Sequence, residues 1–189
     1  MKLNLLAFLS LAITLIACYE PVAPPDWSKS VAPDNQLVQR IIVDLNSSFG
    51  NSTVIRGTVN ARIGSYKLTN ASSEDVKISA FAITMNANAS SFQNLRARIG
   101  SVQIGQTYST LSPVERYVFS PYGSFVMPAN VTIAIDFYSD VSANVVVSTL
   151  ITQPSATSWA SCSGIGMTTG DTIFCVGNPN GQRITITAP

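Results

Sequence analysis

The sequence predicts an all-β fold: an antiparallel β-sandwich of about 8–10 strands that follows an N-terminal signal segment. From position 36 onward, short segments with alternating apolar and polar residues recur about every ten residues. Clusters of Gly, Pro, Asn and Ser separate these segments, as turns separate strands. No apolar stripe of helical period and useful length follows the first 17 residues. These observations favour two packed sheets over a helical or mixed fold.

Residues 1–17 are the predicted signal peptide. A single positive charge at Lys2 precedes an apolar run of about a dozen residues. Such a run is short for a membrane span, which needs about 20 residues, and it is typical of a secretory leader. We therefore expect the protein to be exported.

Cys18 follows the apolar run directly, in the order Leu15-Ile16-Ala17-Cys18. This pattern resembles a lipobox, the bacterial signal that directs cleavage before a cysteine and attachment of lipid to it. Lipid on Cys18 would hold the protein at a membrane, at the cell surface or in the periplasm. The alternative is ordinary cleavage nearby, with Cys18 incidental or removed.

Residues 18–35 form a predicted tether in front of the sandwich domain, residues 36–189. The tether contains four prolines and no sustained periodicity. Proline favours extended polyproline geometry, so the segment would hold a folded domain away from a membrane.

Residues 65–85 are the stretch around which the predicted domain is organised. Apolar positions alternate with polar ones up to residue 69, a polar turn covers 70–75, and a second apolar face follows. The two strands form either a hairpin or a crossover between sheets. The step from Ile78 to Phe81 is three residues instead of two, which predicts a bulge near Ala80.

The other strands are expected on both sides of this pair. Residues 37–45 read as a strand or a short helix, and their β-branched content favours the strand. The clearest alternation lies in residues 130–138, where Ile133, Ile135 and Phe137 share one face. That face should pack against Phe81, Ile83 and Met85. The remaining predicted strand segments lie within residues 54–63, 95–104 (a hairpin turning at Gly100-Ser101), 117–119, 145–149 and 183–187.

Three of these segments resemble immunoglobulin-like β-sandwich modules of prokaryotic cell-surface and S-layer-type proteins. They are the turn with its flanks at residues 68–78, the hairpin at 95–105, and the segment 126–141 that begins Val126-Met127-Pro128-Ala129. The resemblance covers roughly residues 60–151, about half of the chain. It implies a fold and a surface location but no ligand. Unlike the repeated modules, this chain has a single copy.

The charge composition excludes several classes of function. Only 11% of residues are charged, against about 25% in ordinary soluble proteins. The chain has 11 basic and 10 acidic residues, and loss of Lys2 with the leader makes these numbers equal. A nucleic-acid partner is not expected without a basic patch. The chain has no histidine, so we expect no catalytic residues, metal or cofactor.

Cys162 and Cys175 are the only cysteines after Cys18. In an exported protein two such thiols most often form a disulfide. A zinc site is disfavoured because two thiolates supply only half of its ligands. The disulfide would staple a glycine-rich excursion at residues 163–172.

Carboxylates and aromatic residues are weaker candidates for a site. The pairs Glu74 with Asp75 and Asp136 with Asp140 offer oxygen ligands for Ca²⁺, but solvated turns in which Asp caps its own backbone are the favoured explanation. Aromatic rings in a sandwich can stack on sugars but more often fill the core. The candidate aromatic residues are Trp159, Tyr108, Tyr117, Tyr122 and Tyr138. Asn-x-Ser/Thr sequons occur at Asn46, Asn51, Asn70, Asn88 and Asn130.

Two functional hypotheses follow. The first is a non-enzymatic, membrane-anchored cell-surface lipoprotein that displays a β-sandwich for structural or adhesive contacts. Its partners would be the lipid membrane, through Cys18, and envelope proteins or glycans. The alternative is a carbohydrate-binding protein of the cell envelope, which would expose two or more aromatic rings in one plane.

Overall fold

A computed structural model describes residues 39–121, 125–145, 149–154, 162–177, 179 and 181–189, which all lie within the compact unit Gln36–Pro189. Its regular structure consists of strands and one short 3-10 helix, η1 (Ala87–Ser91). The strands are β1 (Arg40–Leu45), β2 (Ser52–Ile55), β3 (Ala61–Asn70), β4 (Val76–Met85), β5 (Phe92–Ile99), β6 (Val102–Thr110), β7 (Arg116–Phe119), β8 (Val126–Met127), β9 (Thr132–Val141), β10 (Thr149–Pro154), β11 (Cys162–Gly166), β12 (Thr172–Val176) and β13 (Gln182–Thr187).

Strand β4 is the centre of one layer of the sandwich. Strands β10 and β11 follow each other along one edge of β4, and β7 and β8 follow each other along the opposite edge. All four pairings are antiparallel. Because both neighbours of β4 are interrupted, the described residues contain more strands than the 8–10 that the sequence predicts.

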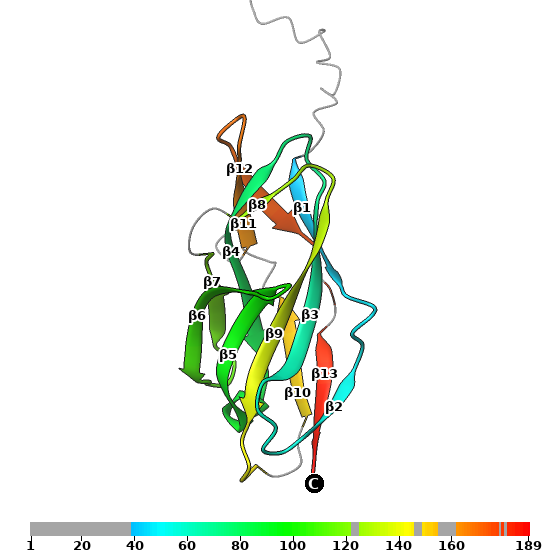
Figure 1. Ribbon diagram of the computed structural model, residues 1–189, viewed down its shortest axis with the longest axis vertical. Coiled ribbons are helices and arrows are strands. Elements are labelled where there is room, and N and C mark those ends of the chain that lie inside the picture. Colours follow the sequence, from blue (N-terminus) through cyan, green and yellow to red (C-terminus); the bar gives the residue numbers. More distant parts are fainter. Residues whose placement is uncertain (1–38, 122–124, 146–148, 155–161, 178, 180) are drawn as a thin grey trace, which may run out of the picture. The chain divides into compact units, whose positions relative to one another are not determined.

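The second layer contains β1, β3, β9, β5 and β6 in that order. Figure 1 shows β3 and β9 lying side by side along most of their length. Strand β12 joins the layers, since it pairs antiparallel with β11 and parallel with β1. Strands β13 and β2 form a second parallel pair. The all-β sandwich is therefore confirmed, with two parallel pairings that the sequence did not predict.

The organising stretch of residues 65–85 is a crossover and not a hairpin. β3 pairs with β1 and β9, whereas β4 pairs with strands of the other layer. The turn between them carries the chain from one sheet to the other. Tyr66 and Leu68 of β3 are fully buried, as their alternation predicts.

The predicted bulge is also confirmed. In the pairing of β4 with β11, Ala80 lies opposite Ser163 and Ile78 lies opposite Gly164, so Ser79 is the extra residue. The bulge keeps Ile78 and Phe81 on the same buried side of the strand.

Phe137 lies at the centre of the core between the sheets. Ile135 and Phe137 are fully buried, and Ile133 is half-buried against the same cluster. The Phe137 ring centroid lies 5.9 Å from that of Phe81 and 5.5 Å from that of Phe119. The predicted contact between this strand and the β4 face is therefore confirmed.

Two predicted segments need correction. Strand β1 begins at Arg40, and residues 37–38 lie outside the described part. The excursion predicted at 163–172 is strand over half of its length, because residues 163–166 belong to β11 and Thr172 begins β12. Gly164 and Gly166 lie buried inside β11, where Val76 and Glu74 leave no room for a side chain. The strand predicted at 145–149 lies mainly outside the described residues; Val145 packs on the core, and Thr149 belongs to β10.

Within the part of the chain that the structure describes, no helix has the length and apolar character needed to cross a membrane.

Candidate interaction surface

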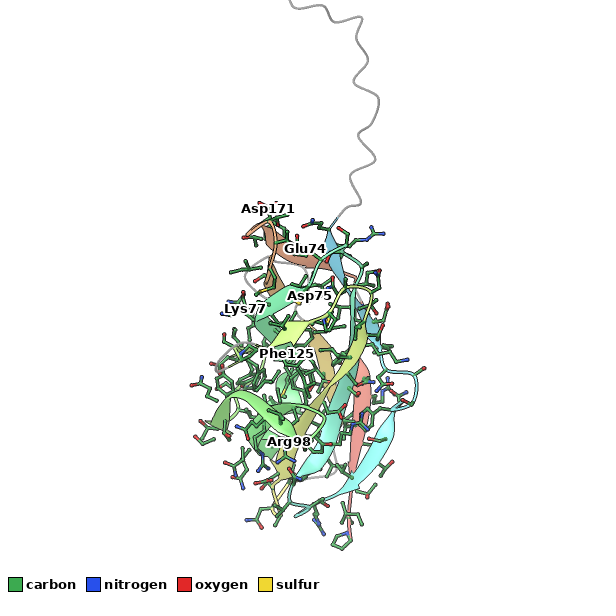
Figure 2. All side chains as sticks on the ribbon, turned by 45° about the horizontal axis from the view of Figure 1, so that its top comes forward. Glu74, Asp75, Lys77, Arg98, Phe125 and Asp171 are labelled. Atoms are coloured by element: carbon green, nitrogen blue, oxygen red, sulfur yellow. A yellow bond between two sulfur atoms is a disulfide. The ribbon has the colours of Figure 1, made fainter. Side chains whose placement is uncertain are left out.

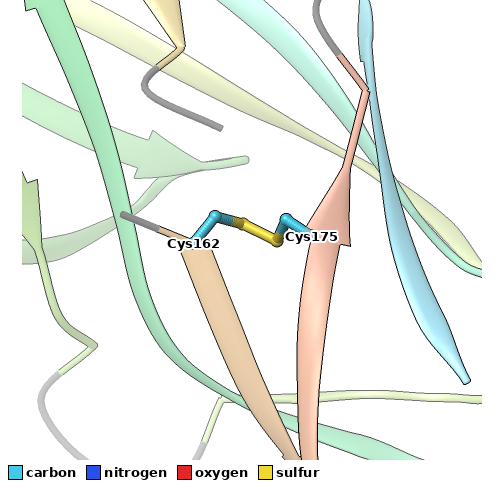
Figure 3. The surroundings of a disulfide bond; sticks show 2 residues. All are labelled: Cys162 and Cys175. Carbon is cyan, nitrogen blue, oxygen red and sulfur yellow. A yellow bond between two sulfur atoms is a disulfide. The ribbon is translucent and has the colours of Figure 1, made fainter. Parts of the chain in front are cut away.

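Strands β11 and β12 form a hairpin that pairs with β4 and β1, brings two cysteines together at its open end and contacts Glu74 at its tip. At its open end, Cys162 and Cys175 face each other with their Cα atoms 5.4 Å apart, inside the range for a disulfide. Figure 3 shows the two side chains meeting between the strands. Both cysteines are buried. The two predicted cysteines are thus brought together, while Cys18 lies outside the described residues.

Glu74 fixes the tip of the same hairpin. The Thr168 N–H donates to Glu74 Oε2 at 2.6 Å, the Thr169 N–H donates to it at 3.1 Å, and the Thr169 hydroxyl donates to Oε1 at 2.9 Å. The hydrogen bond from the Thr168 amide outweighs the effect of burial and, with those from Thr169, lowers the pKa of Glu74. A Cβ atom at Gly166 would lie 2.5 Å from this carboxylate, so the contact needs a glycine there.

The turn that carries Glu74 is itself held by Asn70. The Asn70 side-chain amide donates to the carbonyl oxygens of Glu74, Met127 and Pro128, and its oxygen accepts from the Ser72 N–H at 3.0 Å. This residue is fully buried. The turn is therefore a rigid support, and the Asn70 sequon is closed to glycosylation in the folded protein.

Other sequon asparagines also have structural roles. The buried Asn46 amide donates to the Ser65 hydroxyl at 2.8 Å. The Asn88 amide donates to the Thr149 carbonyl oxygen at 2.6 Å. These contacts explain both asparagines without a glycan.

The outer side of the hairpin and its neighbour β1 carries an apolar cluster that we call the hairpin face: Ile42, Ile165, Phe174 and Val176. Ile165, Phe174 and Val176 are 43%, 45% and 40% exposed. Val176 lies opposite Ile42 in the parallel pairing with β1, and Ile165 lies diagonally across from Phe174. The four side chains form one continuous stripe over three strands.

Two basic residues border the hairpin face. Arg40 lies opposite Phe174 on β1, and Lys77 lies opposite Ile165 on β4. Neither takes part in an ion pair with any residue that the structure describes. Figure 2 shows Lys77, Glu74 and Asp171 at the same end of the domain.

The carboxylates of the predicted pairs each bind a different partner. Asp136 pairs with Arg62, and Asp140 pairs with Arg96. Asp75 accepts from the Ala129 N–H at 3.0 Å. Among the described residues, no group of three potential metal ligands comes together. Turn hydrogen bonds and ion pairs therefore account for the positions of these carboxylates.

The predicted aromatic residues do not form one exposed plane in the described part of the chain. Tyr117 is buried, and Tyr108 and Tyr138 are half-buried. Trp159 and Tyr122 lie outside the described residues. Phe174 is the one aromatic among the large exposed apolar side chains that the structure describes.

Tyr108 closes the seam between β6 and β7. Its hydroxyl donates to the Val118 carbonyl oxygen at 2.6 Å and accepts from the Val118 N–H at 3.1 Å. A shallow depression of about 320 Å³ lies at this seam, lined by Gly105, Gln106, Tyr108, Val118 and Ser120. Its lining has no carboxylate, amine or thiol for catalysis.

Neither a protein-family model nor a curated protein matches the chain. Similar solved structures include the seventh ScaB type I cohesin from Pseudobacteroides cellulosolvens, with a TM-score of 0.44 and 12% identity over 79% of this chain and 94% of that one. A Coh-OlpC–Doc435 type I cohesin–dockerin complex from Clostridium thermocellum gives a TM-score of 0.45 and 10% identity, covering 80% and 96%.

AvmM, which catalyses macrocyclization in alchivemycin A biosynthesis, gives a TM-score of 0.40 and 9% identity, covering 78% and 88%. Binding modules and an enzyme thus share this level of likeness. The β-sandwich of the described residues is established by their own strand pairings. The likeness carries no argument about function.

Sequence reasoning missed the hairpin face. A signal was present, because residues 172–176 read Thr-Ile-Phe-Cys-Val, in which alternate residues point to opposite sides of a strand. With Cys175 directed inward, Phe174 and Val176 must point outward. The glycines around this segment favoured the prediction of a loop instead.

Proposed function

We propose that this protein is an exported, non-enzymatic β-sandwich module that binds a protein partner through the hairpin face. The observation that carries the proposal is the stripe of apolar side chains exposed on a hairpin that pairs with β4 and β1 and is held at its tip by Glu74. Contiguous exposed apolar surface on a soluble domain marks an interaction site more often than isolated apolar residues do.

The fixation of the hairpin supports this proposal. A binding surface that is already ordered loses less conformational freedom when a partner docks. The proposed disulfide would link the two strands at the open end, and the Glu74 carboxylate accepts hydrogen bonds from the tip. The Phe174 ring is therefore presented in a defined position before binding.

The chemistry of the border indicates the kind of partner. An apolar stripe flanked by the unpaired cations of Arg40 and Lys77 is complementary to a protein surface with an apolar centre and carboxylates around it. Such charges raise the association rate and select the orientation of docking.

We further propose that residues 1–17 are removed, that Cys18 carries a lipid, and that residues 18–35 act as a spacer for the domain at 36–189. The apolar leader, the lipobox-like order before Cys18 and the prolines of the spacer support this arrangement. The protein would then be anchored at the cell surface or in the periplasm.

Several features support a non-enzymatic role. The chain has no histidine. Catalytic carboxylic acids commonly have a raised pKa, whereas the two carboxylates with a resolved shift, Glu74 and Asp140, have a lowered pKa. For Asp140, burial acts to raise the pKa, but the hydrogen bonds from Asn94 and the Asn60 N–H and the charge of Arg96 together lower it.

The proposal can be tested with a photo-crosslinking residue in producing cells. Replacing Phe174 with p-benzoylphenylalanine should give a discrete protein adduct, because the side chain lies in the proposed contact. Val59 is the matched control position, since it is 74% exposed but lies outside the hairpin face. The adduct at position 174 should disappear when Ile165→Asp is added. Identical adducts from both positions, or none at 174, would contradict the proposal.

A further inference from the structure

A second surface lies on the outer side of β3, β9 and β5 and is centred on Tyr138. In the strand register, Tyr138 of β9 has Arg62 on one side and Arg96 on the other. Arg98 lies two residues from Arg96 on the same side of β5. We call Arg62, Arg96 and Arg98 the arginine cluster.

Both carboxylates within this cluster already accept hydrogen bonds. Asp136 Oδ1 accepts from Arg62 and from the Ser65 hydroxyl. Asp140 Oδ1 accepts from Arg96 Nη2 at 2.8 Å, and Oδ2 accepts from the Asn94 amide at 2.8 Å. Two of the three guanidinium groups therefore have a carboxylate partner.

Arg98 is the third guanidinium and has no carboxylate partner among the described residues. It lies opposite Asp136 in the strand register, but Asp136 is already bonded to Arg62. The Arg98 guanidinium carbon lies 5.2 Å from the centroid of the Tyr138 ring, and its Nε atom is buried without an acceptor. Stacking on the ring orients this guanidinium while its charge remains unmatched.

On its β6 side, Arg98 has neutral neighbours that can form hydrogen bonds. Gln103 lies opposite Arg98 on β6. Its amide nitrogen donates to the Thr107 hydroxyl at 3.1 Å and to the Gly105 carbonyl oxygen at 3.3 Å, and these bonds orient the side chain. The Gln103 amide oxygen accepts no hydrogen bond from the described residues and is available to a ligand hydroxyl.

We propose that Arg98 anchors a binding site for the carboxylate of an acidic saccharide, with Gln103 and Thr107 contacting its hydroxyl groups. A preorganised guanidinium binds a planar carboxylate through two parallel hydrogen bonds. The site is independent of the hairpin face, and Figure 2 shows Arg98 apart from Lys77 along the domain.

The chemistry of this surface favours a saccharide over other anions. Nucleic acid requires a row of unpaired cations along its phosphates, and only Arg98 is unpaired in this cluster. An acidic protein segment requires an apolar centre for stable docking, which the polar side chains around Tyr138 do not provide. A cation with neutral amide and hydroxyl groups on one side and ion-paired arginines on the other matches a uronic acid unit, and repeated units along a polysaccharide would add avidity.

The test is a calorimetric titration of the purified protein at low salt with tetragalacturonic acid. Its methyl ester is the matched probe, because it keeps the sugar and removes the charge. The acid should bind, and the ester should bind about tenfold more weakly or worse. Arg98→Gln should weaken binding of the acid by a similar factor. Arg98→Lys should weaken it less, since lysine keeps the charge but cannot form two parallel hydrogen bonds to a carboxylate. Arg183→Gln is the control, because Arg183 is exposed on β13.

Any of four results would overturn the proposal: no binding of the acid, equal binding of the ester, no effect of Arg98→Gln, or equal binding of hexaglutamate through Arg98. The last result would define a general carboxylate site instead of a saccharide site. If Arg98→Gln fails to fold, Arg98→Lys and the ester decide the outcome. The photo-crosslink at position 174 should be unchanged in Arg98→Gln, so failure of either proposal is distinguishable from failure of the other.

Discussion

Hydrogen-bond donors surround several acidic side chains of this domain. The Glu74 carboxylate accepts hydrogen bonds from the hairpin tip, and the Asp136 and Asp140 carboxylates each accept from several groups. Tyr66 has its pKa raised to about 12, mainly because burial disfavours the phenolate, and its hydroxyl donates to the Thr152 carbonyl oxygen at 2.7 Å. These polar groups stabilise the fold.

The lowered pKa of Glu74 predicts how stability depends on pH. A carboxylate with a lower pKa in the folded state stabilises that state above its unfolded pKa, and this contribution disappears as the pH falls through the folded pKa. The difference in unfolding free energy between the wild type and Glu74→Gln should therefore be constant near neutral pH and decrease below pH 4.5, the ordinary glutamate value. Urea unfolding at several pH values measures it.

Asp171→Asn is the matched control for this experiment, because Asp171 is exposed on the same hairpin. It should change stability little at any pH. A difference for Glu74→Gln that grows as the pH falls would show that the carboxylate does not hold the hairpin tip.

Phe137 is predicted to contribute more stability than any surface position. Its ring is fully buried among Phe81, Phe119 and Tyr66. Phe137→Ala should lower the free energy of unfolding by about 3–5 kcal/mol, because it leaves a cavity between the sheets. Val59→Ala, at an exposed position, should change it by about 0.5 kcal/mol or less. A loss below about 1 kcal/mol for Phe137→Ala would contradict the packing described.

At the scale of elements, the β11–β12 hairpin is held in place by contacts beyond its own turn. It pairs with β4 on one side and β1 on the other, so it closes one end of the sandwich. The Cys162 and Cys175 side chains lie on its buried side, opposite the hairpin face. Linking them fixes the strand orientation that exposes Phe174.

We predict a covalent link between Cys162 and Cys175. Intact-mass measurement without reductant should find the protein about two mass units lighter than after reduction, since each disulfide removes two hydrogens. Replacing both cysteines with alanine should cost about 3 kcal/mol in the chain-entropy model. Two free thiols in the exported protein would contradict this prediction.

At the scale of the whole molecule, two proposed binding surfaces lie on one rigid sandwich. The hairpin face is apolar with a basic border, and the surface around Arg98 is polar with one unmatched charge. A protein partner and an acidic saccharide could then be held at the same time. Such a module would connect components of a cell envelope without changing them chemically.

The proposed anchor leads to a test of location. Cys18→Ser should release the protein from the membrane fraction into the medium or periplasm, because the lipid attaches through this thiol. The Cys162→Ala/Cys175→Ala variant is the control and should remain in the membrane fraction. A wild-type protein that is already soluble after fractionation would contradict lipid attachment.

Local patterns predicted those parts of the fold that depend on neighbours in the sequence. Alternation located β9 and β13, the three-residue step from Ile78 to Phe81 located the bulge, and Gly100 located the turn between β5 and β6. The strand predicted at 145–149 lies mainly outside the described residues and stays a prediction.

The sequence by itself determined that the chain forms a β-sandwich, since period-two alternation gives each strand one apolar side that must be buried. It did not determine which outward-facing residues remain uncovered or unpaired. That depends on which strands become neighbours. The parallel pairing of β12 with β1 places Phe174 beside Arg40, and Asp136 pairs with Arg62 while Arg98 forms no ion pair among the described residues. Pairing between strands far apart in sequence is a property of the tertiary structure, because no local periodicity encodes the partner.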